Sequence, residues 1–235
     1  MNPNCLYIEI TRDAFKLLNE GERFEAALER QPNGRLTPGC KETLQSRLQE
    51  FLRQKLNRTA WCAIPAQGVS LRKLSLPSVA KDDFQRVLRF QIESEFPLSP
   101  DQLAWGTQPL GKDASGRQQL LAGAVKKELI QDFHDVLSAC GVTPTFTVAP
   151  IARTAACPQP PSNYSVMDLS GTQSELITLE NGVPVSIRVL PCGGNNFQPA
   201  GLNRSSLGSK LFITGNHPCS KQVADQLLQY FNHSV

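Results

Sequence analysis

The residue types that most often carry catalysis or bind metals are few in this sequence and stand far apart. Its three histidines, His134, His217 and His233, form no HxxxH or HExxH pair that could hold a zinc ion on one helix face. Ser170 lies in a Ser-Gly-Thr run rather than in the G-x-S-x-G turn that exposes a hydrolase nucleophile. We therefore predict neither a catalytic residue nor a metal site.

The cysteines also lack a pattern typical of metal binding or of disulfide pairing. They are seven in number, which is odd, and no two of them form a C-x-x-C pair. Their positions are Cys5, Cys40, Cys62, Cys140, Cys157, Cys192 and Cys219. Small buried thiols in a reducing compartment are the expected state.

The composition is that of a globular chain without a nucleic-acid-binding surface. Of its 235 residues 40% are hydrophobic and 19% are charged, and the formal net charge of +3 is dispersed rather than gathered in a basic stripe. No run approaches the roughly 20 apolar residues of a membrane span, and no basic leader precedes an apolar run at the N-terminus. These features predict a cytoplasmic protein.

The first part of the chain alternates as a sheet and then changes to a helical period. The expected strands are LYIEI, AFKLLNE, RFEAALER and, later, TAWCAIP. Between them lies an amphipathic helix after Cys40, with apolar residues at three- and four-residue spacing. That apolar stripe comprises Leu44, Leu48, Phe51, Leu52 and Leu56.

A β-α-β-β-α block follows, and a second set of strands comes after it. The block consists of the strand LRKLSLP, a helix over 82–96, the strands LAWGTQPLG and QLLAGAVKK, and a helix over roughly 127–140. The strand TFTVAP, a helical turn and the proline-rich linker CPQPPSNY come next. The strands SVMDLS, SELITLENG, PVSIRVLP and KLFITG precede a closing helix, SKQVADQLLQYF, and Asn181-Gly182 predicts a tight hairpin turn. No internal repeat stands out by period.

Four passages in this order resemble the PilM/GspL family of type IV pilus assembly and type II secretion. They are IPAQGVSLRKLSLP, LRFQIESEFPLSPDQLAW, LLAGAVKKELIQDFHDVLSACGVTPTFTVAPIARTAA and MDLSGTQSELITLENGVPVSIRVLPCGG. The resemblance implies an α/β, actin-like (ribonuclease H-like) two-lobed fold. It divides the chain into a first lobe over 1–70, an inserted subdomain over 71–144, a return to the first lobe over 145–157, and a reduced second lobe over 158–235.

The same resemblance implies two glycine-bearing loops around nucleotide phosphates, with an aspartate in each that positions magnesium. The first loop departs from this pattern, because Glu9 stands where an aspartate is expected and no glycine follows. A polar loop also replaces several helices of the second lobe. The corresponding positions of these degenerate loops are Glu9, Thr11, Asp168, Ser170, Gly171, Thr172 and Gly215. We expect neither ATP nor magnesium as a cofactor.

Two of these residues have alternative structural interpretations. For Asp168 the favoured interpretation is a strand-end residue that caps the Ser170-Gly171 turn through its side-chain oxygen, because the partner loop is degraded. Glu9 fits an outward-facing strand position between Ile8 and Ile10.

The helix over 82–96 carries the predicted partner surface. Phe90 falls off the apolar stripe and stands among charged residues, a pattern common at interfaces, although burial against the first lobe is the alternative. The predicted contact residues are Arg72, Arg86, Arg89, Phe90, Glu93, Phe96 and Pro97.

Resemblance to PilM implies a non-catalytic scaffold at the cytoplasmic face of the inner membrane, which binds the cytoplasmic segment of a PilN-like membrane protein. Resemblance to GspL implies contact with the assembly ATPase. An ATP-binding switch or weak ATPase of the actin-like superfamily is the alternative from another class. A third interpretation, an FtsA-like division scaffold, would require a membrane-binding helix, and KQVADQLLQYFNHSV is short and not strongly basic.

Overall fold

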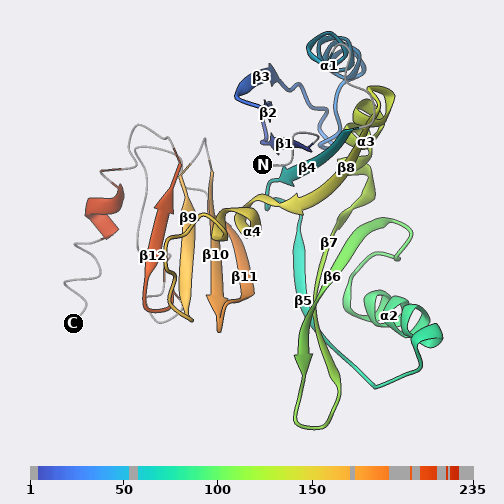
Figure 1. Cartoon of the computed structure of the whole chain (residues 1–235), viewed down its shortest axis with the longest axis vertical. Coiled ribbons are helices and arrows are strands. Elements are labelled where there is room, and N and C mark those ends of the chain that lie inside the picture. The colour runs from blue at the N-terminus through green and yellow to red at the C-terminus, as the bar shows by residue number, and fades with distance from the viewer. Residues whose placement is uncertain are drawn as a thin grey trace. The chain divides into compact units, whose positions relative to one another are not determined.

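The computed structural model divides into two compact units (Figure 1). The first contains Met1–Val69, Val79–Gly106 and Gly123–Ala149, and the second contains Ser70–Ser78, Thr107–Ala122 and Pro150–Val235. The structure describes residues 5–52, 58–169, 173–190, 202, 207–215, 221 and 223–227. The division into lobes and an inserted subdomain given above stays a prediction.

A five-stranded sheet forms the centre of the first unit. Its strands are β1 (Cys5–Ile10), β2 (Ala14–Asn19), β3 (Glu22–Ala27), β4 (Arg58–Ile64) and β8 (Val142–Val148), in the order β3-β2-β1-β4-β8. The first three pair antiparallel, whereas β4 pairs parallel with both β1 and β8. The predicted strands are confirmed. β8 begins three residues earlier than the expected TFTVAP, because an edge strand tolerates Pro144.

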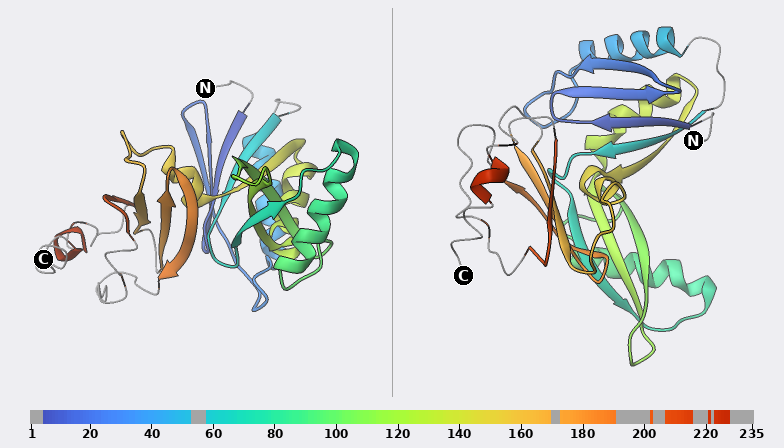
Figure 2. Two further views of the ribbon diagram at one scale, coloured as in Figure 1. Left: turned by 90° about the horizontal axis from the view of Figure 1, so that it is seen from below. Right: turned by 60° about the vertical axis from the view of Figure 1, so that its left-hand side comes forward.

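Two helices bury one face of this sheet (Figure 2). In α1 (Pro38–Phe51), the Thr37 hydroxyl accepts a hydrogen bond from the Cys40 amide, and Pro38 occupies the first turn. α3 (Lys127–Ala139) follows β7 directly. Both helices contribute leucines and a phenylalanine to a core with alternate residues of β1, β2 and β4. The expected continuation of α1 to Leu56 lies outside the described residues.

The sheet of the second unit repeats the pairing of the first. Its strands are β9 (Tyr164–Asp168), β10 (Ser174–Glu180), β11 (Val183–Leu190) and β12 (Leu211–Thr214), in the order β11-β10-β9-β12. The first three are antiparallel and β12 is parallel to β9, as β4 is to β1. The predicted hairpin turn is confirmed, since Asn181 and Gly182 have φ values of 52° and 73°. The sequence showed no such repeat.

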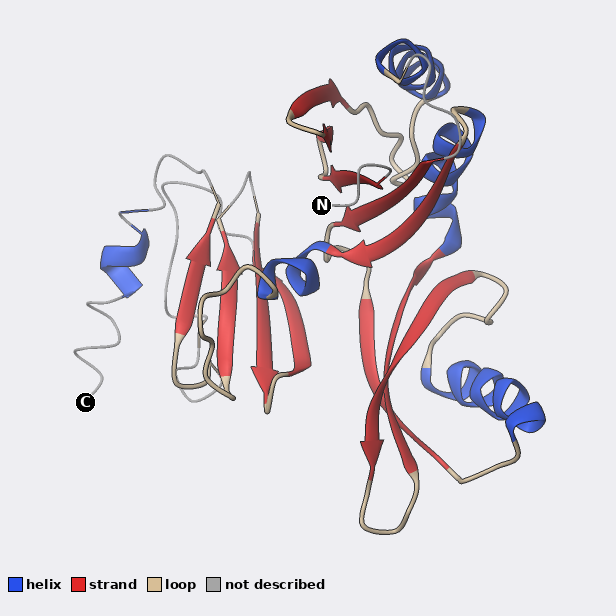
Figure 3. Cartoon of the chain, in the orientation of Figure 1, coloured by secondary structure: helices blue, strands red, loops and turns tan. Residues whose placement is uncertain are grey.

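A third sheet and two more helices complete the described elements (Figure 3). The sheet contains β5 (Ser70–Leu76), β6 (Leu103–Lys112) and β7 (Gln118–Lys126) in the order β5-β7-β6. α2 (Lys81–Glu95) lies between β5 and β6 in the chain, so the expected β-α-β-β-α succession is confirmed. α4 (Ala149–Thr154) follows β8. The closing helix lies largely outside the described residues, of which 223–227 are helical.

Within the described part of the chain, no helix is both long and apolar enough to cross a membrane.

Phe15 should dominate the stability of the first unit. Its ring is fully buried and lies 6.2 Å from the ring of Phe24 and 6.4 Å from that of Phe133. We expect Phe15→Ala to lower the free energy of unfolding by about 3–5 kcal/mol in chemical denaturation, because it removes a large core side chain. Phe90→Ala, at a residue that is 64% exposed, is the control and should change it by less than about 0.5 kcal/mol. Equal losses in the two variants would contradict this account of the core.

Candidate functional site

A cavity of about 660 Å³ opens in the first unit. Its walls are the loop over residues 31–34, the loop over residues 64–68, and the start of α3, together with the ends of β1 and β7. The volume falls in the range of roughly 300–1,000 Å³ that is usual for binding pockets. Segments from three distant parts of the sequence therefore form one hollow.

The part of the cavity lining that α3 contributes, called its floor below, is mostly apolar, and Leu129 lies against both loops. Leu129, Ile130 and Phe133 line it from the helix. Gly34 and Gly68 have φ values of +87° and +80°, and a Cβ added at these positions would lie 3.0 Å and 3.6 Å from the two Leu129 methyl groups. Glycine is thus needed in both loops for the backbone conformation, and at Gly34 also for the close approach to α3.

Arg30 joins two walls of the cavity. Its Nε donates to the Arg12 carbonyl at 2.9 Å and its Nη2 donates to the Thr11 carbonyl at 3.1 Å. Its Nη1 donates to the Gly34 carbonyl at 2.8 Å, and the guanidinium lies 5.4 Å from the centre of the Phe133 ring. Burial lowers the pKa of Arg30, and nearby Asp13 and Asp132 oppose that shift. One side chain thereby links the β1–β2 turn, the 31–34 loop and α3.

Asp132 holds the same loop from the other side. Its carboxylate is 3% exposed and accepts from Arg35 Nη2 at 2.7 Å and from the Leu36 amide at 3.1 Å. Lys41 Nζ lies 3.4 Å from Asp132 and 3.1 Å from Asp135. Burial alone raises the pKa of Asp132, but the bonds from Arg35, the Leu36 amide and Lys41 together lower it below its ordinary value.

The predicted first nucleotide loop is closed by its own hydrogen bonds. The Thr11 amide donates to the Ala14 carbonyl at 2.8 Å, and the Ala14 amide donates to the Thr11 hydroxyl at 2.9 Å. The carbonyls of the turn accept from Arg30, as described above. Glu9 is half-buried on β1, between the buried Ile8 and Ile10. A phosphate needs free N–H groups, and the Thr11 and Ala14 amides are already bonded within the turn.

Asp168, one of the predicted positions of the degenerate nucleotide loops, is likewise bonded inside the second unit. It is 5% exposed, and its carboxylate lies 3.3 Å from Arg153 Nη2 and accepts from the Thr214 hydroxyl at 3.0 Å. Arg153 also pairs with Glu175 at 2.7 Å. The guanidinium therefore supplies the positive charge next to this carboxylate that a metal ion would otherwise supply.

The remaining predicted loop residues are only partly described. Gly215 follows β12 with a φ of +105°, a conformation that favours glycine. Ser170, Gly171 and Thr172 lie outside the described residues, and with them the turn that Asp168 was expected to cap.

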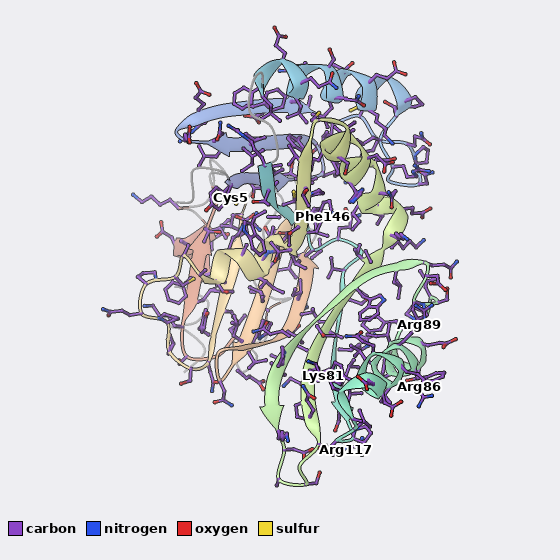
Figure 4. All side chains as sticks on the ribbon, turned by 45° about the vertical axis from the view of Figure 1, so that its right-hand side comes forward. Cys5, Lys81, Arg86, Arg89, Arg117 and Phe146 are labelled. Carbon is purple, nitrogen blue, oxygen red and sulfur yellow. The ribbon has the colours of Figure 1, made fainter. Side chains whose placement is uncertain are left out.

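The predicted partner surface lies mostly on α2, away from the cavity lining. Figure 4 shows Arg86 and Arg89 projecting from this helix; they donate to Asp83 and Asp101 respectively, each at 2.8 Å. Phe90 is 64% exposed, which favours the interface interpretation over burial.

The other predicted contact residues differ in exposure, and none of the seven is among the described residues that line the cavity. Arg72, Glu93 and Pro97 are exposed, whereas Phe96 is buried in the core and is not part of the surface in this structure.

The sequence analysis missed the residues that do line the cavity, among them Arg12, Arg30 and Lys126. The signal available for them was slight. In the sequence, Pro32-Asn33-Gly34 has only the pattern of a break between elements, and Gln67-Gly68 is part of the passage IPAQGVSLRKLSLP. Both are loops with a left-handed glycine, which is a feature of backbone that must approach another segment closely.

Comparison with known proteins identifies the fold. No protein-family model matches the chain, and no curated protein matches it. A solved structure with the actin-like ATPase fold from Bacteroides thetaiotaomicron superposes with a TM-score of 0.52 at 10% identity, over 97% of this chain and 88% of that one. The chain has an actin-like fold. Its repeated sheets, β3-β2-β1-β4 and β11-β10-β9-β12, agree with that assignment.

Two further similar structures come from pilus and secretion systems. A chain of a PilM–PilN type IV pilus biogenesis complex matches with a TM-score of 0.58 at 22% identity, over 82% of this chain and 63% of that one. The cytoplasmic domain of EpsL, an inner-membrane component of the type II secretion system of Vibrio cholerae, matches with a TM-score of 0.55 at 12% identity, over 91% and 83%. The chain thus spans less than two thirds of the PilM–PilN chain, and identities this low establish the fold alone.

Asp132 should stabilise the cavity wall in a pH-dependent way. We expect Asp132→Asn to lower the free energy of unfolding at neutral pH by about 1–3 kcal/mol, because it removes charged hydrogen bonds from a buried acceptor. The pKa of Asp132 is lowered in the folded state, so its contribution is present above the unfolded value of about 3.9 and is lost as the pH falls through the folded value.

Urea unfolding of the wild type and the variant at neutral pH and at about pH 3 measures this effect, and the gap between them should narrow in acid. Asp135→Asn, at a carboxylate that is 44% exposed, is the control and should cost no more than about 1 kcal/mol. A gap that stays constant across this pH range would show that Asp132 acts by packing rather than by charge.

The bonding of Thr11, Ala14 and Asp168 predicts that Mg-ATP does not bind. Isothermal titration of the protein with Mg-ATP should show no heat of binding at micromolar concentrations. Micromolar binding that Asp168→Ala abolishes would contradict this prediction and favour an ATP-dependent switch.

Proposed function

We propose that this protein is a non-catalytic scaffold of a type IV pilus or type II secretion inner-membrane platform. The cavity at the start of α3 receives the cytoplasmic segment of a PilN-like membrane protein. Through that partner the protein is held at the cytoplasmic face of the inner membrane. The observation that carries the proposal is the cavity itself, which the 31–34 loop, the 64–68 loop and the start of α3 line together. Resemblance to PilM implies that the partner segment docks in a groove between the predicted first lobe and the predicted inserted subdomain, and this cavity is the proposed groove.

The mechanism of binding follows from the residues that line the cavity. The apolar floor of Leu129, Ile130 and Phe133 buries apolar side chains of the segment and supplies most of the affinity. Arg12 and Lys126 at the rim set the register of the segment. Arg30 and Asp132 hold the 31–34 wall in place before the partner arrives, which reduces the ordering cost of binding.

The bonding of the two nucleotide-loop positions supports a scaffold rather than an ATPase. Arg30 bonds the carbonyls of the β1–β2 turn, and Arg153 pairs with Asp168 at the end of β9. Both loop positions are thus stabilised by groups of the chain itself.

The exposed face of α2 is the proposed second contact, with the assembly ATPase as its partner. Phe90 is the apolar anchor, and Arg86, Arg89 and Glu93 surround it along the helix. Arg72 and Pro97 belong to the same proposal as exposed residues.

Two variants separate the contacts in one experiment. Gln67 is exposed at the cavity, so Gln67→Trp should block the hollow without disturbing the core. We expect this variant to recover at least tenfold less PilN-like protein from native cells than the wild type does, with recovery of the ATPase unchanged. Phe90→Ala should have the opposite pattern. Quantitative mass spectrometry of affinity-purified full-length chain provides the measurement, and recovery of no pilus or secretion platform protein by the wild type would reject the proposal.

A further inference from the structure

The charges around the cavity have one sign. Arg12, Arg30 and Lys126 line it, and none of the described lining residues is an aspartate or glutamate. Asp13 lies 4.0 Å from Arg12, but both side chains are more than 60% exposed, so water screens this pair strongly. The buried carboxylate of Asp132 is bonded to Arg35 and Lys41 and acts through space on Arg30, so Arg12 and Lys126 are the lining cations that the proposal uses.

The two exposed cations differ from Arg30 in what they can offer a ligand. Arg30 directs Nε, Nη1 and Nη2 at backbone carbonyls, so its charge acts mainly through space. Lys126 is exposed at the end of β7, and Arg12 is exposed in the β1–β2 turn. These two side chains are therefore able to turn toward an anion at the rim.

Lys126 also lines a second hollow, of about 380 Å³, on the neighbouring side of α3. Lys127 and Gln131 line that hollow with it, and Glu128 is its acidic residue. The two hollows therefore adjoin at a lysine, and one extended segment can reach both.

We propose that the segment bound in this cavity is acidic: it places an apolar side chain on the Leu129 floor and an aspartate or glutamate on each side of it, against Arg12 and Lys126. A segment of this kind complements both the apolar and the basic residues of the site. A small anion would leave the apolar floor exposed, and a basic segment would be repelled by the lining cations. The inference rests on the proposed function for the identity of the partner, whereas its chemistry rests on the cavity alone.

Selection from a random library of displayed 12-residue peptides tests the chemistry without knowledge of the partner. The full-length protein should enrich peptides in which leucine, isoleucine or phenylalanine is flanked by aspartate or glutamate. The tightest selected peptide is then labelled and titrated by fluorescence anisotropy, beside a version with asparagine and glutamine in place of its acids. We expect the amide version to bind at least tenfold more weakly, and the affinity of the acidic peptide to fall with added salt.

Charge reversal in the protein locates the site. Lys126→Glu should weaken the acidic peptide at least tenfold, and this substitution suits its position, because an acidic residue is favourable next to the N-terminus of a helix. Arg23→Glu, at an exposed position of β3 outside the described lining, makes the same change in net charge and should alter the affinity less than twofold. The melting temperatures of both variants show whether folding is preserved.

Each result bears on one of the two proposals. Three outcomes overturn the acidic-segment inference. The selection returns no peptide, or it returns peptides without acidic enrichment, or Lys126→Glu and Arg23→Glu weaken binding of the acidic peptide equally. If a platform protein is nevertheless recovered from cells and lost with Gln67→Trp, the proposed function stands without it. If acidic peptides bind at Lys126 while no platform protein is recovered, the chemistry of the cavity stands and the proposed function fails.

Discussion

The first unit depends on the loop between β3 and α1, which two charged side chains hold from opposite sides. The Arg30 side chain extends from this loop and bonds the β1–β2 turn, whereas the Asp132 side chain extends from α3 and bonds this loop. Arg30 bonds three main-chain carbonyls, and Asp132 is bonded to Arg35, Lys41 and the Leu36 amide, so both groups have hydrogen-bond partners within the protein. The cavity exists because these bonds keep the loop apart from the 64–68 loop, with Leu129 between them. A single α3 residue thus contacts both loops, and a single carboxylate keeps one of them in position.

The two sheets repeat one strand order, and in each unit an arginine is bonded close to a strand that the repeat relates. In the first unit Arg30 bonds main-chain carbonyls, and in the second Arg153 pairs with two carboxylates of β9 and β10. In both units the arginine is therefore bonded to groups of the protein itself, which fixes the β1–β2 turn in the first unit and the pairing of Asp168 with Glu175 across β9 and β10 in the second.

Local patterns predicted the elements well. Strand alternation identified β1, β2 and β4, the Asn181-Gly182 pair identified the β10–β11 turn, and the apolar stripe of α2 left Phe90 outside it. The start of β8 was not predicted correctly, because Pro144 interrupts the alternation. The strand order shows that β8 is an edge strand, where a proline is tolerated. The candidate site was harder to predict. Asp132 has the appearance of a surface residue in a charged helix, yet it binds Arg35, which is 97 positions away in the chain.

The sequence by itself therefore determined the type and order of the elements, because helix and strand periods are properties of neighbouring residues. It also carried the resemblance from which the actin-like fold was expected. The tertiary structure decided which loops meet, which charges are buried, and where the cavity opens. It decided these because parallel pairing of β1, β4 and β8 brings together segments whose separation along the chain has no local signature. The repeat of the two sheets was also decided by the tertiary structure, since the two sheets share a strand order although the residues show no repeat along the chain.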